Sequence, residues 1–219
     1  MRLAFFGPPG GGKGTQADLV KDDAHAVQVA TGDLLRAAVK DQTPVGKRAQ
    51  EFMGRGSLVP VEIVNEILRE RVVQTDAREG YILDGYPRTI GQLCSLTALL
   101  SELKMPVERW LFIDVPFAAI EERVLGRRTC KSCQASYDLK FNPSPKGDRC
   151  GKCDGELYQR PDDSAEKLRT RLDAYTKDTL PVVHLLKNLG LLVTIEAGTK
   201  KVDEVAVLVR KALGLPGRR

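Results

Sequence analysis

A glycine-rich segment near the start of the chain limits its fold more than any other feature. The segment Gly7-Pro8-Pro9-Gly10-Gly11-Gly12-Lys13-Gly14-Thr15 directly follows the apolar run at residues 3–6 and leads into a helical pattern at residues 15–22. Glycines let successive backbone N–H groups converge on phosphate oxygens, and the N-terminus of the following helix adds a favourable dipole. Lys13 adds a positive charge at the β and γ phosphates. The segment therefore predicts a phosphate-binding P-loop inside a strand–loop–helix unit.

One position of this P-loop departs from the usual pattern. Gly14 stands where a serine or threonine would otherwise coordinate Mg²⁺, and Thr15 follows one residue later. This substitution argues against a generic P-loop ATPase. The chain also contains no Asn-Lys-x-Asp element, which argues against a GTPase.

The rest of the chain alternates apolar runs with amphipathic helical stretches, a pattern typical of a parallel sheet covered by helices. Near-continuous apolar runs of this kind fit strands that are buried on both faces. We therefore expect an α/β fold with a doubly wound, five-stranded parallel sheet and helices on both faces. The expected strands lie at residues 3–6, 27–30, 81–83, 110–115 and 191–195, and the expected helices at residues 15–22, 32–40, 61–73, 90–103, 117–125, 165–188 and 202–213.

The alternation breaks at residues 126–163, where Gly, Pro, Lys, Cys and Asn replace the helical period. A structureless loop of that length is improbable in a compact domain, so we expect a small inserted domain with its own means of stabilisation. Two Cys-x2-Cys pairs, Cys130 with Cys133 and Cys150 with Cys153, have a spacing that suits a tetrahedral structural Zn²⁺. Redox thiols or packed cysteines are the alternatives. Cys94 belongs to no pair, and we expect it to be buried in its helix.

Composition and charge exclude several classes of protein. The 34 Lys+Arg and 29 Asp+Glu residues leave a net charge of +5 over 219 residues, which permits nucleic acid as a partner without requiring it. No apolar run approaches the roughly 20 residues that cross a bilayer. The first ten residues lack the apolar length and cleavage site of a signal peptide. We therefore expect a cytoplasmic protein without a membrane partner, and in a reducing compartment the five cysteines point to metal rather than disulfides.

Two acidic motifs precede expected helices. Thr31-Gly32-Asp33 has the form of a helix N-cap, but Arg36, one turn further, has no capping use, which favours a binding role. Asp162-Asp163 precedes Ser164 in the same way, and there a cap and a nucleotide-binding role remain equally open.

A third polar motif ends an expected strand. Asp84-Gly85 lies beside the P-loop, where a nucleotide-bound Mg²⁺ usually meets a carboxylate. Pro87 predicts a rigid turn, with a cis peptide bond as the hypothesis, that aims Arg88 at a phosphate. Gln92 lies one helical turn beyond Arg88, so both side chains can face one pocket.

Three motifs together resemble those of the adenylate kinases: Gly-Lys-Gly-Thr-Gln at residues 12–16, Thr-Gly-Asp-Leu-Leu-Arg at 31–36 and Asp-Gly-Tyr-Pro-Arg-Thr at 84–89. The match in order and spacing runs from residue 1 to about residue 213 and looks like the bacterial long-lid form. The resemblance implies reversible transfer of the γ-phosphoryl group of MgATP to AMP, giving two ADP, by a monomer. It also implies a core at residues 1–29, 60–125 and 164–219, an AMP-binding helical insert at residues 30–59 and a zinc-binding lid at residues 126–163.

The resemblance implies roles for individual residues as well. Asp33 and Asp84 would meet Mg²⁺ through water. The residues implied in catalysis are Lys13, Arg88, Arg123, Arg160 and Arg171. Those implied in ATP binding are Gly10, Gly12, Lys13, Gly14, Thr15, Arg123, Arg127 and Lys200. Those implied in AMP binding are Thr31, Arg36, Val59, Gly85, Arg88, Gln92, Arg160 and Arg171.

The reaction needs no general base, because the acceptor is a phosphate oxygen that is already anionic near neutral pH. What remains is in-line positioning and neutralisation of charge, which planar guanidinium groups do well. The isolated His25 and His184 are expected to be surface or packing residues.

Two other functions are consistent with parts of the sequence. A kinase for CMP, UMP or GMP would share the P-loop and the arginines, and the Gln92 amide alone could also pair with guanine. A zinc-ribbon, nucleic-acid-binding ATPase is suggested by the cysteine pairs, but Tyr137 and Phe141 are the only aromatic residues between them, too few for a stacking platform.

Overall fold

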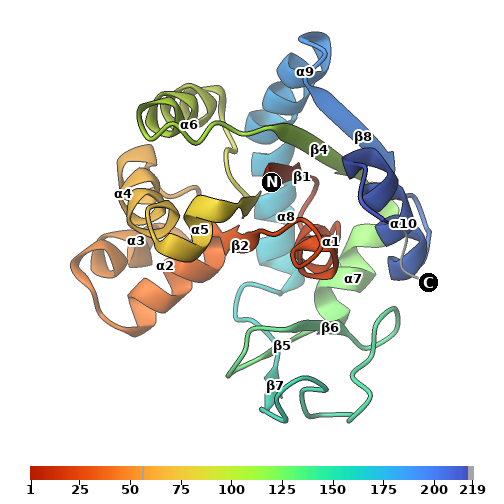
Figure 1. Ribbon diagram of the computed structural model, residues 1–219. Helices are drawn as coiled ribbons and strands as arrows, with labels where there is room; N and C mark the ends of the chain where they lie inside the picture. The colour runs from red at the N-terminus through yellow and green to blue at the C-terminus, as the bar shows by residue number, and fades with distance from the viewer. Residues whose placement is uncertain (56, 217–219) are drawn as a thin grey trace.

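The computed structural model describes residues 1–55 and 57–216 and is built on a five-stranded parallel sheet (Figure 1). The strand order is β2-β3-β1-β4-β8, and each pair of neighbours is parallel. The predicted α/β class and doubly wound sheet are therefore confirmed. The strands are β1 (Arg2–Phe6), β2 (Val27–Ala30), β3 (Tyr81–Asp84), β4 (Arg109–Asp114) and β8 (Leu192–Glu196), each within one residue of its expected position.

The sheet is buried on both faces because successive side chains of a strand point to opposite sides. In β1, Leu3 and Phe5 join one core cluster, whereas Ala4 between them joins another. In β3, Ile82 belongs to the first of these clusters and Leu83 to the second. Each of these residues is at most 1% exposed, which explains why these strands are continuous apolar runs in the sequence.

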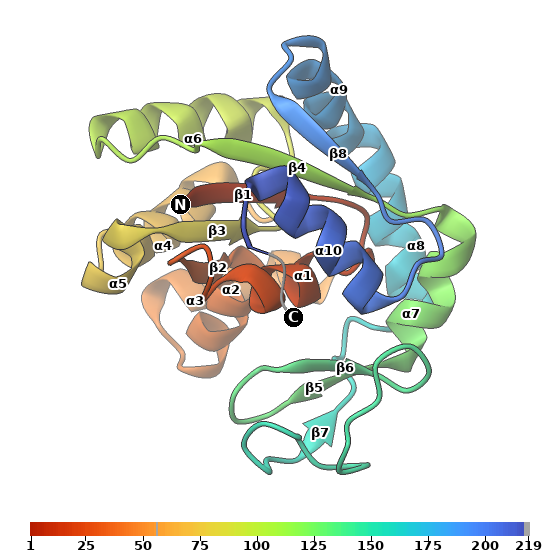
Figure 2. The same ribbon diagram turned by 45° about the vertical axis from the view of Figure 1, so that its right-hand side comes forward.

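Helices cover each face of this sheet. Figure 2 shows α1 and α10 on one side of it and α6 and α9 on the other, in agreement with the core clusters. The helices that the sequence predicts are α1 (Lys13–Val20), α2 (Thr31–Lys40), α4 (Val61–Val72), α6 (Ile90–Glu102), α7 (Ile120–Gly126), α8 (Ala165–Ala174), α9 (Leu180–Asn188) and α10 (Val202–Leu213).

Two of the expected helices are less regular than the periodicity indicates. The expected helix at 165–188 consists of α8 and α9 joined by a π-helical segment, η2 (Tyr175–Thr179). The helix expected at 117–125 begins as a 3-10 segment, η1 (Phe117–Ala119), before α7. Segments of π-helix occur preferentially near functional sites, and Tyr175 and Thr179 do line the central cavity described below.

The structure also contains two helices that the sequence analysis missed, α3 (Pro44–Gly54) and the short α5 (Thr75–Glu79). A start signal for α3 was present, because Thr43 Oγ1 accepts a hydrogen bond from Gly46 N at 3.1 Å and Pro44 occupies the first turn. Gly46 lets α3 approach α2 closely, since a Cβ atom there would lie 2.0 Å from the carbonyl oxygen of Ala38.

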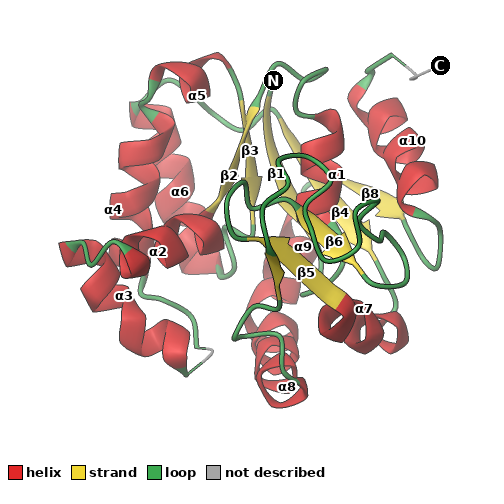
Figure 3. Cartoon of the chain, turned by 90° about the horizontal axis from the view of Figure 1, so that it is seen from below, coloured by secondary structure: helices red, strands yellow, loops and turns green. Residues whose placement is uncertain are grey.

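The segment expected to form an inserted domain folds as a separate small sheet. Its strands β5 (Arg127–Cys130), β6 (Ser136–Asp138) and β7 (Leu157–Tyr158) form an antiparallel sheet in the order β6-β5-β7. Seen from below, β5 and β6 lie in front of the main sheet (Figure 3). None of the helices in the described part of the chain is both long enough and apolar enough to span a bilayer.

The central sheet should be sensitive to the loss of a single core side chain. Leu111 in β4 is fully buried, so we expect Leu111→Ala to leave a cavity and lower the free energy of unfolding by about 2–5 kcal/mol. Urea denaturation followed by circular dichroism measures this change. Val207→Ala is the matched control, because Val207 is 64% exposed and its truncation should change stability by less than about 0.5 kcal/mol. Equal losses for the two variants would contradict the assigned core.

Candidate active site

The P-loop lies between β1 and α1, and its lysine faces a small, partly open cavity. Lys13 Nζ donates hydrogen bonds to the carbonyl oxygens of Gly7 at 2.8 Å and Pro8 at 2.9 Å. The cavity of about 70 Å³ is lined by Lys13, Arg88 and Arg171, which come from three different elements. Burial lowers the pKa of Lys13 to about 8; Asp84 opposes this shift, and Arg88 and Arg171 add to it.

The conformation of the P-loop requires glycine at two of the predicted ATP-binding positions. Gly10 and Gly12 have φ angles of 74° and 84°, in the region that favours glycine. A Cβ atom on Gly10 would also lie 2.6 Å from Val124 Cγ2 in α7. The glycine run therefore serves both the backbone turn and the close packing of α7 against it.

Gly14 has a structural reason for replacing the serine or threonine of a generic P-loop. A Cβ atom on Gly14 would lie 3.0 Å from Asp84 Oδ2 and 3.3 Å from Gln28 Nε2. Gln28 Nε2 donates to Asp84 Oδ2 at 3.2 Å, so the carboxylate occupies the space next to α1 that a hydroxyl side chain would need. The sequence analysis missed Gln28, because a glutamine inside a short strand gives no signal of its own. Thr15 follows in the first turn of α1.

The loop between β3 and α6 has the conformation that the sequence suggests. The Tyr86–Pro87 peptide bond is cis, which confirms that hypothesis, and Gly85 has a φ of 79°. Arg88 Nε donates to the Gly85 carbonyl at 2.7 Å, and the Arg88 backbone N–H donates to Gln92 Oε1 at 2.7 Å. Gln92 is buried, and its side-chain oxygen therefore holds the loop of Arg88.

The first turn of α2 contains ion pairs rather than a side-chain cap. The helix starts at Thr31 with Ala30 as its N-cap and no side-chain capping bond, so the expected N-cap at Thr31-Gly32-Asp33 is wrong. The Asp33 carboxylate accepts hydrogen bonds from Arg36 and, at 3.1 Å, from Arg160 Nη2 in the lid segment. Arg160 Nε also donates to Thr129 Oγ1 at 3.0 Å. This arrangement brings three predicted binding residues together.

The structure excludes Asp162 and Asp163 as the cap of α8, because Ser164 caps that helix. The side chain of Asp163 is fully buried and accepts from Arg127 Nε at 2.7 Å and from Arg171 Nη1 at 3.3 Å. Asp162 Oδ2 pairs with Arg171 Nη1 at 3.2 Å. Burial would raise the pKa of the Asp162 carboxyl, but Arg171 and other arginines outweigh it, so its pKa lies below the ordinary value. Both carboxylates hold predicted clamp arginines.

Other predicted residues lie around rather than in the cavity. The Arg123 guanidinium lies 5.5 Å from the ring centroid of Phe141. Lys200 is exposed in the turn between β8 and α10, with its backbone N–H bonded to the Ala197 carbonyl at 2.9 Å. Thr31 and Val59 are both buried.

Four cysteines come together beside the small sheet, at the end of β5 and in the turns next to it. The Sγ atoms of Cys130, Cys133, Cys150 and Cys153 lie within 4.8 Å of one another. Four thiolates converging at such distances are the donor set that a tetrahedral Zn²⁺ takes, so these residues fit the expected metal. The prediction for Cys94 is wrong: this cysteine is exposed, because it lies on the outer face of α6 between the buried positions Leu93 and Leu96.

The cysteine-containing segment also contacts α1 through residues that the sequence analysis did not single out. Lys152, between Cys150 and Cys153, forms an ion pair with Asp18 of α1, and Lys21 pairs with the same carboxylate at 2.8 Å. Nothing in the local sequence could reveal this pairing, since the two partners are separated by more than half of the chain.

Fold and site together define a class. The P-loop lies on a parallel α/β sheet, a lysine and two arginines line one cavity, and an inserted sheet contributes further arginines. These are the features of a P-loop phosphotransferase.

The comparisons with known proteins narrow this class. The family model described as "Adenylate kinase" matches residues 5–191. An adenylate kinase of Thermodesulfovibrio yellowstonii is 45% identical over 94% of this chain and 95% of its own length. Adenylate kinases of Caldicellulosiruptor saccharolyticus (45%, over 98% of this chain and 100% of the relative) and Methanosarcina barkeri (43%, over 97% and 98%) are similar to the same extent. The chain belongs to the adenylate kinase family.

The buried Asp163 should matter more to this site than an exposed carboxylate nearby. Asp163→Asn keeps the size of the side chain but removes the charge that orients Arg127 and Arg171. We expect kcat to fall by about 100-fold, since misplacement of a clamp by about 1 Å has an effect of that order. Steady-state kinetics measures it. Asp148→Asn, at an exposed position of the same inserted segment, is the control and should keep the wild-type kcat. Similar kinetics for both variants would show that Asp163 does not position the arginines.

Proposed function

We propose that this chain is an adenylate kinase, which transfers the γ-phosphoryl group of MgATP reversibly to AMP and so forms two ADP. The observation that carries the proposal is the cavity in which the P-loop lysine Lys13 meets Arg88 and Arg171. The names of the relatives support the same activity.

The chemistry of the proposed reaction matches the charges of the cavity. The acceptor oxygen of AMP is already an anion, so the site needs positive charge and exact alignment more than a base. Lys13, Arg88 and Arg171 supply that charge, and His25 and His184 are both exposed. Mg²⁺ bound with ATP would neutralise phosphate charge, and Asp84, which Gln28 holds beside Gly14, would meet it through water together with Asp33.

The assignment of the two nucleotides to the two sides of the cavity is part of the proposal. We place ATP on the P-loop side, and AMP on the side of α2 and of the loop that contains Arg88. Arg160 and Arg171 would bridge the two. The ATP side comprises Gly10, Gly12, Lys13, Gly14, Thr15, Arg123, Arg127 and Lys200, and the AMP side comprises Thr31, Arg36, Val59, Gly85, Arg88, Gln92, Arg160 and Arg171.

We propose that the chain is divided into a core and two segments that move relative to it. Residues 1–29, 60–125 and 164–219 form the core, residues 30–59 the AMP-binding insert and residues 126–163 the lid. The lid would exclude water from bound ATP, because a kinase must not hydrolyse its donor. Zn²⁺ held by Cys130, Cys133, Cys150 and Cys153 would stabilise the lid. We further propose a cytoplasmic monomer that needs neither nucleic acid nor a membrane as a partner.

Zinc removal should affect the lid and spare the sheet. The lid strands are short and depend on the four cysteines, whereas the main sheet has its own apolar core. We expect chelation of the zinc-loaded protein to create a separate low-temperature unfolding transition in calorimetry while the main transition stays in place. Metal analysis before and after chelation is the necessary control. An unchanged calorimetric profile after verified metal loss would contradict a stabilising metal.

The choice of acceptor is the decisive test of the function. We expect ADP formation from MgATP with AMP, and much slower transfer to CMP, UMP or GMP offered separately. A coupled assay or chromatography of the nucleotides measures it. Equal or faster transfer to another monophosphate would overturn the assigned base specificity while keeping the mechanism. ATP binding without transfer to any acceptor, together with salt-sensitive oligonucleotide binding, would favour the nucleic-acid-binding alternative.

A further inference from the structure

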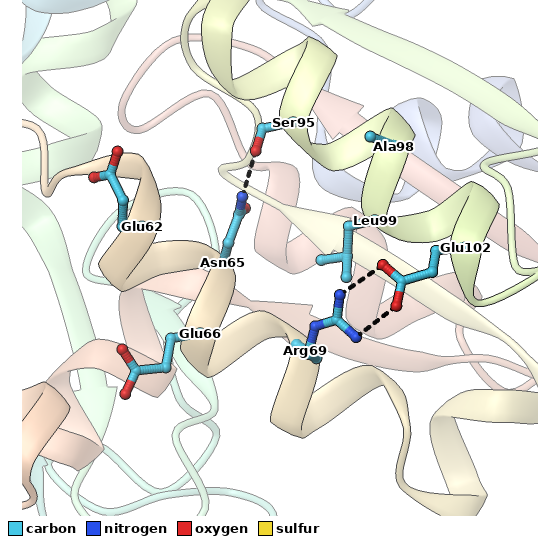
Figure 4. A pocket seen from close by; sticks show the side chains of 8 residues that line it. All are labelled: Glu62, Asn65, Glu66, Arg69, Ser95, Ala98, Leu99 and Glu102. Carbon is cyan, nitrogen blue, oxygen red and sulfur yellow. Dashed lines mark hydrogen bonds and ion pairs between the residues drawn. The ribbon is translucent and has the colours of Figure 1, made fainter.

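A groove of about 310 Å³ lies between α4 and α6 (Figure 4). Two polar contacts cross it. Asn65 Nδ2 of α4 donates to Ser95 Oγ of α6 at 2.6 Å, and the guanidinium of Arg69 donates to both carboxylate oxygens of Glu102 at 3.1 and 2.8 Å. The two contacts join the same pair of helices, but only one of them continues through a further hydrogen bond toward the active-site cavity.

Asn65 also forms a hydrogen bond to a residue that lines the active-site cavity, whereas the Arg69 side chain forms none to such a residue in the described part of the chain. Asn65 Oδ1 accepts a hydrogen bond from Tyr86 Oη at 2.5 Å. Tyr86 is 2% exposed and lines the central cavity together with Pro87 and Arg88, the next two residues of the chain. A continuous chain of side-chain hydrogen bonds therefore runs from Ser95 through Asn65 to the tyrosine that precedes the phosphate-facing arginine.

We propose that Asn65 is a positioning residue for the acceptor phosphate, which acts through Tyr86 on the loop that holds Arg88. A buried hydroxyl without a partner is strongly unfavourable, so Tyr86 stays in place as long as Asn65 accepts its hydrogen bond. Burial raises the pKa of the Tyr86 hydroxyl, which keeps it a proton donor. The opposite side of the loop is held by Gln92 of α6. Asn65 thus attaches the other side of the Arg88 loop to α4.

The place of α4 in the chain gives this attachment a further consequence. The helix begins directly after Val59 and its N-cap Pro60, where the proposed AMP-binding insert ends. A displacement of the insert that shifts α4 would reach Arg88 through Asn65 and Tyr86. This inference rests on the proposed function, because it takes Arg88 as a ligand of the AMP phosphate.

The test is a pair of single variants and their combination, with KM for AMP and for ATP measured for each. Asn65→Leu leaves the Tyr86 hydroxyl buried without an acceptor, and we expect KM for AMP to rise about fivefold or more at an unchanged KM for ATP. Tyr86→Phe should have a smaller effect in the same direction, because Asn65 is half-buried and keeps Ser95. The double variant should have a KM for AMP closer to wild type than Asn65→Leu, since no buried group is then unpaired. Asn65→Asp, which retains an acceptor oxygen, should rescue the single-variant defect.

The matched control is Glu102→Gln, which weakens the other contact across the same groove. It should leave KM for AMP unchanged. Thermal unfolding of all variants shows whether the changes in KM merely reflect losses of stability. Additive effects in the double variant, an equal rise of both KM values, or the same defect in the Glu102 control would overturn the proposal. If Asn65→Leu does not fold, Asn65→Asp and Tyr86→Phe decide it.

Calorimetric binding of AMP separates failure of this inference from failure of the proposed function. A wild-type protein that transfers no phosphoryl group to AMP overturns the proposed function, and a wild type that also does not bind AMP overturns both. An active wild type whose Asn65→Leu variant binds AMP with unchanged affinity overturns only the role of Asn65.

Discussion

The structure depends on keeping several positive charges together in a cavity that is only partly open to water. Lys13, Arg88 and Arg171 line that cavity, and like charges repel strongly once they leave bulk solvent. Burial and this repulsion together bring the pKa of Lys13 down to about 8. Phosphate oxygens would neutralise the cluster when a nucleotide binds. Carboxylates near the cavity also offset part of this charge, and their placement explains much of the surrounding architecture.

One of these carboxylates, Asp84, comes from the carboxyl edge of the parallel sheet, whereas Asp163 does not. Asp84 ends β3 and reaches the first turn of α1, where Gly14 leaves room for it, since a Cβ atom there would lie 3.0 Å from Asp84 Oδ2. Gln28 from the neighbouring strand fixes the carboxylate. Asp163 approaches from the other side, at the end of the lid segment, and binds Arg127 and Arg171. Gly14, which replaces the usual serine or threonine of a P-loop, is therefore matched to Asp84 at the end of β3.

The sequence predicted these features to different degrees, for physical reasons. Strands and long helices follow from periodicity, and the cysteine cluster from spacing, because both signals are local. The short α5 and the π-helical segment at Tyr175–Thr179 leave almost no periodic signal. Cys94 was misplaced because a single apolar-type residue says little about which side of α6 it faces. Long-range partners, such as Gln28 with Asp84, become visible only when the strands are assembled.

The ion pairs around residues 126–163, the lid that we propose, differ in strength. Lys152 is 55% exposed in its pair with Asp18, and an exposed pair contributes about 0–1 kcal/mol. The contact of Asp33 with Arg160 is less exposed, but its carboxylate is also shared with Arg36. The pair of Asp163 with Arg127 has a fully buried carboxylate, and breaking such a pair costs about 3–5 kcal/mol. In the proposed lid motion, the exposed pair at the tip would therefore open first, while the buried pair of Asp163 with Arg127 near its base would keep Arg127 in place.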